Sequence, residues 1–180
     1  LKDNAMSNFH PDIELITEYA AGSLPLAQAA CVSIHVTHCR RCQRIAGELC
    51  NLGATLFEAL APVPVGDVQL NAVLARLDEE MPLAYANKKG NASDTPAILQ
   101  RLMRGDFSDL NWNNIGSTLR ISYLKTGDPD HEFALYHIRA GGRIPEHTHR
   151  GTEMTLILEG GFSDANGSYH KGDFLIRRPG

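Results

Sequence analysis

The sequence predicts a multidomain α + β protein in which a helical domain precedes a β domain. Hydrophobic residues recur at helical spacing over residues 6–80, but they alternate at a spacing of two after Gly105. Between these parts, the chain is rich in Asn, Ala, Lys and Gly and has no hydrophobic period. We therefore expect domains at residues 6–80 and 106–180, joined by a linker at residues 81–105.

The composition narrows the class of protein. The chain has 180 residues, of which 43% are hydrophobic, enough for one domain or two small ones. No apolar run approaches the roughly 20 residues of a membrane span, and the first ten residues lack the features of a secretory signal. The four unevenly spread cysteines do not suggest a disulfide framework. We therefore expect a cytoplasmic protein whose natural start is Met6.

Charge is distributed unevenly along the chain. Residues 1–80 contain 5 Lys and Arg against 10 Asp and Glu, whereas residues 81–180 contain 12 against 11. The acidic N-terminal part argues against direct nucleic-acid binding, which requires cationic groups. It suits either a basic protein partner or a solvated acidic surface.

Four apolar stripes at helical spacing predict four helices in the N-terminal domain. They lie within residues 10–22, 23–38, 40–60 and 67–81. Gly22 is a stop signal for the first helix, while Ser23 and Asp67 are candidate caps for the second and fourth.

The C-terminal domain is predicted to consist of short strands, after a short helical stretch at residues 97–103. The alternating runs are residues 118–127, 131–142, 153–161, 167–173 and 173–178. Short strands separated by Gly, Asp and Asn predict a small sandwich or barrel.

A first cluster of metal-binding residue types, His35-x3-Cys39-x2-Cys42, lies at the end of the second predicted helix. Imidazole nitrogens and thiolate sulfurs are good zinc ligands, and a Cys-x2-Cys turn brings two sulfurs to one ion. His35 and Cys39 are four residues apart and share a helix face. Three ligands leave one corner of a tetrahedron open, so a fourth must come from elsewhere.

The candidates for the fourth ligand are His10, His38, Cys31 and Cys50. We choose His10, because ligation from before the first helix would tie the N-terminus to the helices. His38 adjoins Cys39, which strains simultaneous binding, and we expect Cys31 and Cys50 to pack as small apolar groups. A redox-active cysteine pair and plain packing of buried cysteines remain alternatives to zinc.

A second cluster, His147-x-His149-x3-Glu153, lies between Gly141 and Gly160. Side chains alternate along a strand, so these three groups share one face if the strand is continuous. Two imidazoles and a carboxylate on one face predict a divalent-metal site with room for further ligands. Surface residues without a metal are the alternative.

The first cluster resembles the zinc-binding anti-sigma domain family over residues 9–80. Besides the ligands, the flanking sequences LITEYAAGSL and CQRIAGEL are similar to that family's helices. The resemblance implies a four-helix domain that binds Zn²⁺ through His10, His35, Cys39 and Cys42. It also implies that this domain wraps an extracytoplasmic-function (group IV) sigma factor and blocks its RNA polymerase-binding surface.

The second cluster, with its glycines, resembles the first motif of the cupin superfamily over residues 106–180. KGDFLIRRPG resembles the start of the second motif, whose histidine would lie beyond Gly180. We therefore expect a C-terminal cupin β-barrel that is incomplete at its C-terminus. The resemblance implies a divalent metal, expected to be Zn²⁺, bound by His147, His149 and Glu153.

The two motifs in this order resemble the ChrR-type anti-sigma factors. That resemblance implies that the protein is not an enzyme and forms a heterodimer with the sigma factor. It also implies that the sigma factor is released from this heterodimer on oxidative, singlet-oxygen-like stress. Apolar residues not needed in the core would face the partner, and the candidates are Leu15, Ile16, Tyr19, Leu74 and Leu77, although core packing is the expected role of each one taken singly. The alternatives are a metal-dependent cupin dioxygenase with an accessory helical zinc domain, and a metal or redox sensor without a sigma partner.

Overall fold

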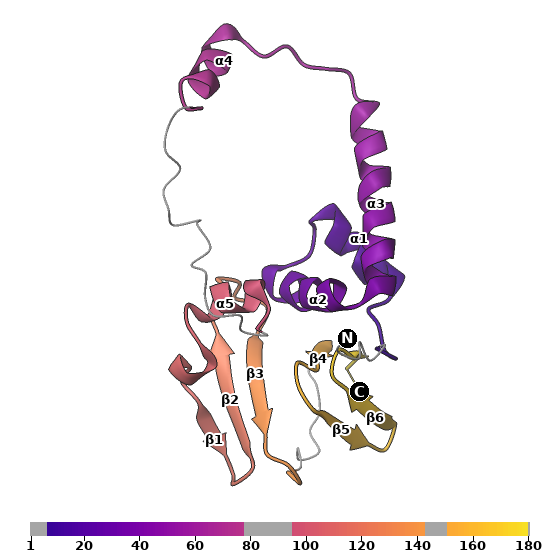
Figure 1. The fold of residues 1–180 in the computed structure, drawn as a ribbon, viewed down its shortest axis with the longest axis vertical. Coiled ribbons are helices and arrows are strands. Elements are labelled where there is room, and N and C mark those ends of the chain that lie inside the picture. The colour runs from indigo at the N-terminus through magenta and orange to yellow at the C-terminus, as the bar shows by residue number, and fades with distance from the viewer. Residues whose placement is uncertain (1–6, 78–94, 143–150, 180) are drawn as a thin grey trace, which may run out of the picture.

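The computed structural model describes residues 7–77, 95–142 and 151–179, which form helices and strands in separate parts of the chain (Figure 1). The helices are α1 (Ile13–Ala21), α2 (Leu26–His38), α3 (Arg40–Glu58), α4 (Asp67–Leu74), α5 (Ala97–Met103) and the 3-10 turn η2 (Phe107–Asp109). The strands are β1 (Asn113–Ile115), β2 (Leu119–Leu124), β3 (Phe133–Ile138), β4 (Glu153–Leu156), β5 (Gly161–Asp164), β6 (Gly167–His170) and β7 (Phe174–Arg177). The predicted mixture of helices followed by strands is confirmed. Within the described ranges, no helix is long and apolar enough to cross a membrane.

Two predicted helix caps are wrong. Helix α2 begins after Pro25, and the Ser23 hydroxyl instead donates a hydrogen bond of 3.1 Å to the Glu18 carbonyl, which closes the end of α1. Helix α4 is capped by Gly66, so that Asp67 is its first residue. An acidic residue in the first turn still suits the positive end of the helix dipole.

Helices α1, α2 and α3 pack against one another, whereas α4 lies apart from them and has no buried residue (Figure 1). Leu15 and Ile16 of α1 are 6% and 1% exposed, because they contribute to cores with α2 and α3. Core packing, the expected role of each of these residues taken singly, is therefore confirmed for both. Leu74 and Leu77, by contrast, are 48% and 71% exposed.

The strands form three antiparallel sheets, with the orders β1-β2-β3, β4-β7 and β5-β6. The register places Ile121 opposite Tyr136 in the first sheet and Glu153 opposite Arg177 in the second. In the part of the chain that the structure describes, these sheets are not joined into a closed barrel.

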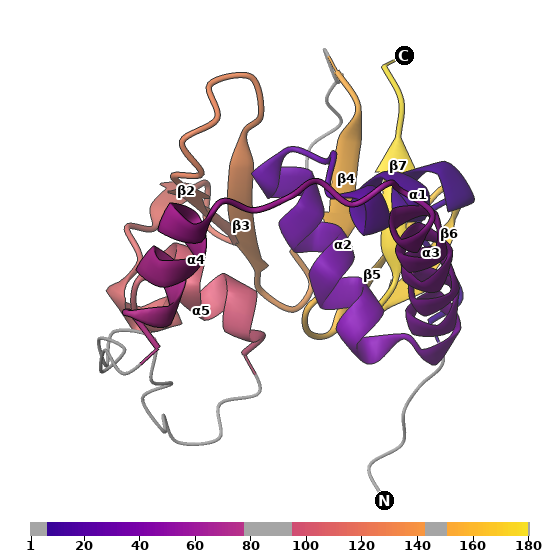
Figure 2. The ribbon, with the colours of Figure 1, turned by 90° about the horizontal axis from the view of Figure 1, so that it is seen from above.

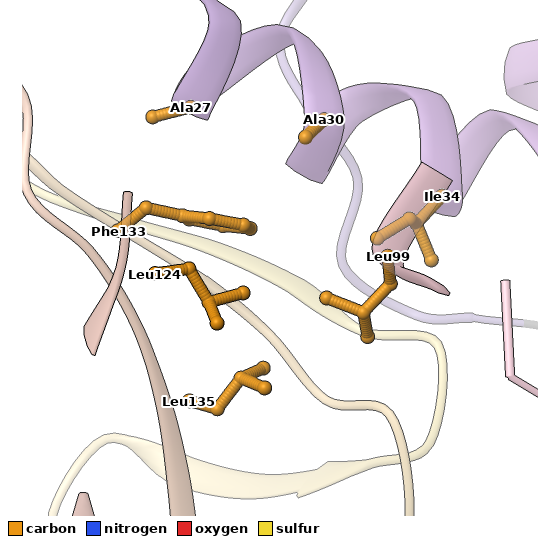
Figure 3. Close-up of a cluster of buried hydrophobic side chains, with 7 residues drawn as sticks. All are labelled: Ala27, Ala30, Ile34, Leu99, Leu124, Phe133 and Leu135. Carbon is orange, nitrogen blue, oxygen red and sulfur yellow. The ribbon is translucent and has the colours of Figure 1, made fainter. Parts of the chain in front are cut away.

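One hydrophobic core joins the helical part to the β part (Figure 3). It consists of three residues of α2, one of α5 and three of strands β2 and β3: Ala27, Ala30, Ile34, Leu99, Leu124, Phe133 and Leu135. On a second side of α2, Val32 packs against Leu15 and the β7 residue Phe174. Helix α2 therefore contacts α1 and α3 as well as α5 and the strands, and Figure 2 shows it from above between α5 and α1.

Candidate metal centre

The four predicted ligands of the first cluster come together at one end of α2. His10 precedes α1, His35 lies in the last turn of α2, Cys39 separates α2 from α3, and Cys42 lies in the first turn of α3. The ligand atoms all lie within 4.8 Å of one another. The extended backbone of Cys39 (φ −105°, ψ 106°) turns the chain between the two helices, so that the two sulfurs face the same point.

The distances between the ligand atoms fit a tetrahedron. His10 Nδ1 lies 3.3 Å from His35 Nε2, 3.4 Å from Cys39 Sγ and 3.6 Å from Cys42 Sγ. With ordinary zinc–ligand bond lengths, the edges of a tetrahedron are about 3.3 Å between two nitrogens and about 3.6 Å between nitrogen and sulfur. The four residues could therefore hold a four-coordinate metal ion, with His10 at the corner that the other three leave open.

The protonation of these groups also favours a cation. Burial lowers the pKa of both His10 and His35, which keeps the rings neutral and able to ligate. Burial, together with the neighbouring Cys39 sulfur, raises the pKa of the Cys42 thiol to about 12. Without a cation this thiol therefore stays protonated, whereas a divalent metal would supply the positive charge that two adjacent thiolates need.

The orientation of the His35 ring is set by a residue of the β part. His35 is 1% exposed, and its Nδ1 donates a hydrogen bond of 2.8 Å to the carbonyl oxygen of Gly172, between β6 and β7. Because a carbonyl can only accept, Nδ1 carries the proton and Nε2 is left free to face the other ligands. Metal-ligating histidines commonly donate their second ring nitrogen in this way.

Asp173 holds the segment that carries His10. Its carboxylate is 1% exposed, and accepts hydrogen bonds from the amides of Asn8 (2.8 Å), Phe9 (3.2 Å) and His170 (2.8 Å). Burial by itself raises the pKa of this carboxyl, but these hydrogen bonds outweigh it and lower the pKa below its usual value. Sequence analysis missed Gly172 and Asp173, since they were assigned only to the cupin turn motif.

The rejected candidates for the fourth ligand lie outside this cluster. His38 is exposed and its Nδ1 lies 2.9 Å from the carbonyl oxygen of Ile34. Cys31 packs in the cores around α2, where burial raises the pKa of its thiol to about 11. Cys50 is exposed on α3, so its predicted packing is wrong.

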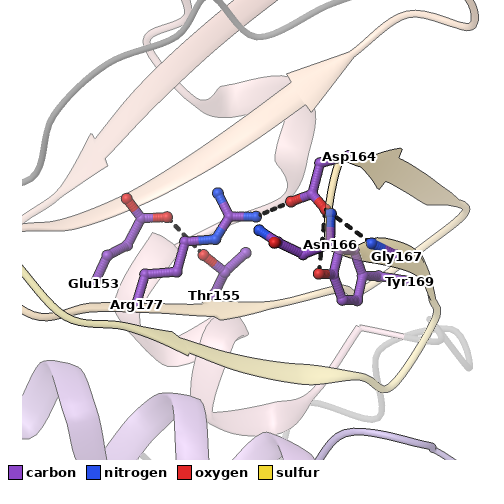
Figure 4. Close-up of polar contacts among 7 residues, drawn as sticks. All are labelled: Glu153, Thr155, Asp164, Asn166, Gly167, Tyr169 and Arg177. Carbon is purple, nitrogen blue, oxygen red and sulfur yellow. Dashed lines mark hydrogen bonds and ion pairs between the residues drawn. The ribbon is translucent and has the colours of Figure 1, made fainter. Parts of the chain in front are cut away.

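The second predicted cluster is described only in part, because His147 and His149 lie outside the described residues. Glu153 is the first residue of β4, and its carboxylate accepts a hydrogen bond of 2.7 Å from the Thr155 hydroxyl. Nearby, Arg177 forms an ion pair with Asp164, which also accepts from the Tyr169 hydroxyl at 3.2 Å (Figure 4). Polar side chains from β4, β5, β6 and β7 thus gather beside Glu153.

Comparison with known proteins agrees with both parts of the structure. Residues 100–180 match the model of the ChrR cupin-like domain. The anti-sigma-E factor ChrR of Cereibacter sphaeroides is 33% identical over 167 residues, which cover 93% of this chain and 78% of that protein. A chain in the crystal structure of Rhodobacter sphaeroides SigE in complex with the anti-sigma ChrR is 32% identical, with a TM-score of 0.83. That match covers 96% of this chain and 88% of the other.

These similarities extend over both the helical part with its His/Cys cluster and the β part. The relative is an anti-sigma factor rather than an enzyme, which confirms the expectation of a non-enzymatic protein and argues against a cupin dioxygenase. The chain belongs to the ChrR family of anti-sigma factors.

Proposed function

We propose that this protein binds an extracytoplasmic-function sigma factor as a heterodimer and keeps it from RNA polymerase. One observation carries the proposal: a long apolar surface on the C-terminal half of α3, on α4 and between them. We call residues 52–77 the α3–α4 arm. Its exposed apolar residues are Leu52, Leu56, Phe57, Leu60, Val63, Val65, Val68, Leu70, Val73, Leu74 and Leu77.

Such a surface is costly in water and favours a protein partner. The exposed fractions of Leu56, Phe57 and Leu60 are 62%, 74% and 66%. Full burial of one side chain of this size contributes roughly 1.5–3 kcal/mol. Large contiguous apolar patches on soluble proteins mark interaction sites, and a bacterial relative has been crystallised with a sigma factor.

We further propose that the first cluster binds Zn²⁺ through His10, His35, Cys39 and Cys42. A closed site with four protein ligands supplies folding free energy rather than catalysis. His35 and the two cysteines hold α2 against α3, and His10 ties the N-terminal segment to both. The α3–α4 arm therefore projects from a region that the metal stabilises.

The remaining features of the proposal come from the sequence motifs. Residues 6–80 form the anti-sigma domain, residues 81–105 the linker and residues 106–180 a cupin domain with a barrel. In that domain a divalent metal is held by His147, His149 and Glu153. The cytoplasmic complex releases its sigma factor on oxidative, singlet-oxygen-like stress.

Isothermal titration of the full chain with the group IV sigma factor from the same genome tests the proposed partner. We expect a one-to-one complex, and we expect Phe57→Asp to weaken it at least tenfold because a charge replaces an apolar contact. Ile115→Asp in β1 is the matched control, since Ile115 is also apolar and 47% exposed but lies outside the arm. Equal affinity of Phe57→Asp and Ile115→Asp would contradict the proposed binding surface.

A further inference from the structure

The turn between β6 and β7, residues 171–173, contacts the segments that carry two of the four metal ligands. The carbonyl oxygen of Gly172 accepts a hydrogen bond of 2.8 Å from Nδ1 of His35. The carboxylate of the adjacent Asp173 accepts hydrogen bonds from the backbone amides of Asn8 and Phe9, the two residues before His10. Within the described residues, this turn thus hydrogen-bonds to His35 itself and to the segment that precedes His10.

In the segment before His10, both backbone N–H groups and a backbone carbonyl form hydrogen bonds with the β part. The Phe174 amide donates to the Phe9 carbonyl at 3.0 Å, while the Asp173 carboxylate accepts the Phe9 amide at 3.2 Å. The Phe9 ring also contacts the Tyr169 ring of β6, with centroids 5.0 Å apart. His10 thus follows a segment whose backbone is hydrogen-bonded to the β part.

We propose that the β6–β7 turn is an outer shell of the metal centre, in which Asp173 is a positioning residue for His10 and Gly172 one for His35. This inference rests on metal binding at the four ligands, as proposed above. Outer-shell partners fix the orientation of the ligands, and their loss commonly weakens metal binding 10–100-fold. The metal centre and the cupin-like part are therefore one coupled unit.

The coupling is reciprocal. If the position of the turn changes the affinity for the metal, then the metal changes the stability of the turn by the same factor. An event in the cupin-like part that displaces residues 171–173 would loosen His10 and His35 together. Conversely, loss of the metal would free the turn from the N-terminal segment.

Replacement of Asp173 by Asn tests the inference with a nearly isosteric change. The carboxylate only accepts hydrogen bonds, and its two oxygens face Asn8 and Phe9 on one side and His170 on the other. The Asn side chain has only one oxygen, so its NH₂ group, which is a donor, must face one of these N–H donors. We expect the Asp173→Asn chain to bind zinc about tenfold more weakly in competition with a chromogenic chelator.

Asp164→Asn is the matched control. Asp164 also accepts hydrogen bonds from two backbone amides, those of Asn166 and Gly167 (Figure 4), and none of its hydrogen bonds among the described residues reaches residues 7–10. We expect this variant to lower the melting temperature while zinc affinity stays at the wild-type value. An Asp173→Asn chain that binds zinc as tightly as wild type would overturn the inference. A wild-type chain that binds no zinc would instead refute the metal site itself.

Hydrogen exchange of the wild-type chain, with and without zinc, keeps the inference testable if the Asp173→Asn chain does not fold. Removal of zinc should speed exchange at the amides of Asn8, Phe9 and Phe174 at least fivefold, and leave strand β2 unchanged. Unchanged exchange at Phe174, or an equal increase throughout β2, would exclude a specific link between metal and turn.

Discussion

Helix α2 and the α3–α4 arm are both apolar helical segments, yet their environments are opposite. The α2 residues Ala30, Val32 and Ile34 are 1%, 0% and 5% exposed, because strands and helices cover them. In the arm, Leu56 and Phe57 are 62% and 74% exposed. Apolar periodicity therefore predicts a helix with an apolar stripe, but it does not reveal which surface covers that stripe.

The difference assigns separate roles to the two regions. Helix α2 carries His35 and contacts the other helices, α5 and the strands, so a change there acts on folding. The arm contributes no buried residue from Leu52 to Leu77, so a change there should act on binding. Substitutions matched between the two regions test this distinction.

The largest effect is expected from removal of a metal ligand on α2. His35→Ala should remove one bound zinc per chain, that of the first cluster, and lower the free energy of unfolding by about 5 kcal/mol or more, since the metal contributes directly to folding. His38→Ala is the control, because His38 lies one residue from Cys39 but is exposed and outside the cluster. Metal analysis and urea unfolding measure both effects, and equal results for the two variants would contradict the site.

A smaller loss is expected in the core that α2 shares with the strands. Leu99 is 0% exposed and contacts α2 residues as well as β2 and β3 residues. Leu99→Ala should leave a cavity and lower the free energy of unfolding by about 3 kcal/mol, measured by urea unfolding of the zinc-loaded chain. A change below about 1 kcal/mol would mean that the helical and β parts do not share this core in solution.

The smallest effect on the free chain is expected in the arm. Leu56→Ala should change the free energy of unfolding by no more than about 0.5 kcal/mol, because the side chain is already in water. The same chain should bind the sigma factor several-fold more weakly, which titration measures. A large loss of stability in the unbound chain would show that another part of the protein covers the arm.

Sequence analysis predicted local features better than long-range ones. The His35-x3-Cys39-x2-Cys42 spacing and the helix stripes are local, so the cluster and the helices could be located from the sequence. The hydrogen bonds of Gly172 with His35 and of Asp173 with Asn8 join segments more than a hundred positions apart, and no local pattern encodes them.

One further error has the same origin. Ser23 was expected to begin α2, but it closes α1, since a hydroxyl between two helices can bond to either of them.

Hydrogen exchange of residues 52–77, in the free chain and in its complex with the sigma factor, measures whether the α3–α4 arm is the surface that binds the partner. We expect amides of the α3–α4 arm to become strongly protected in the complex, while those of α2 exchange slowly in both states. An arm that exchanges equally fast with and without the partner would contradict the assignment of this surface to sigma-factor binding.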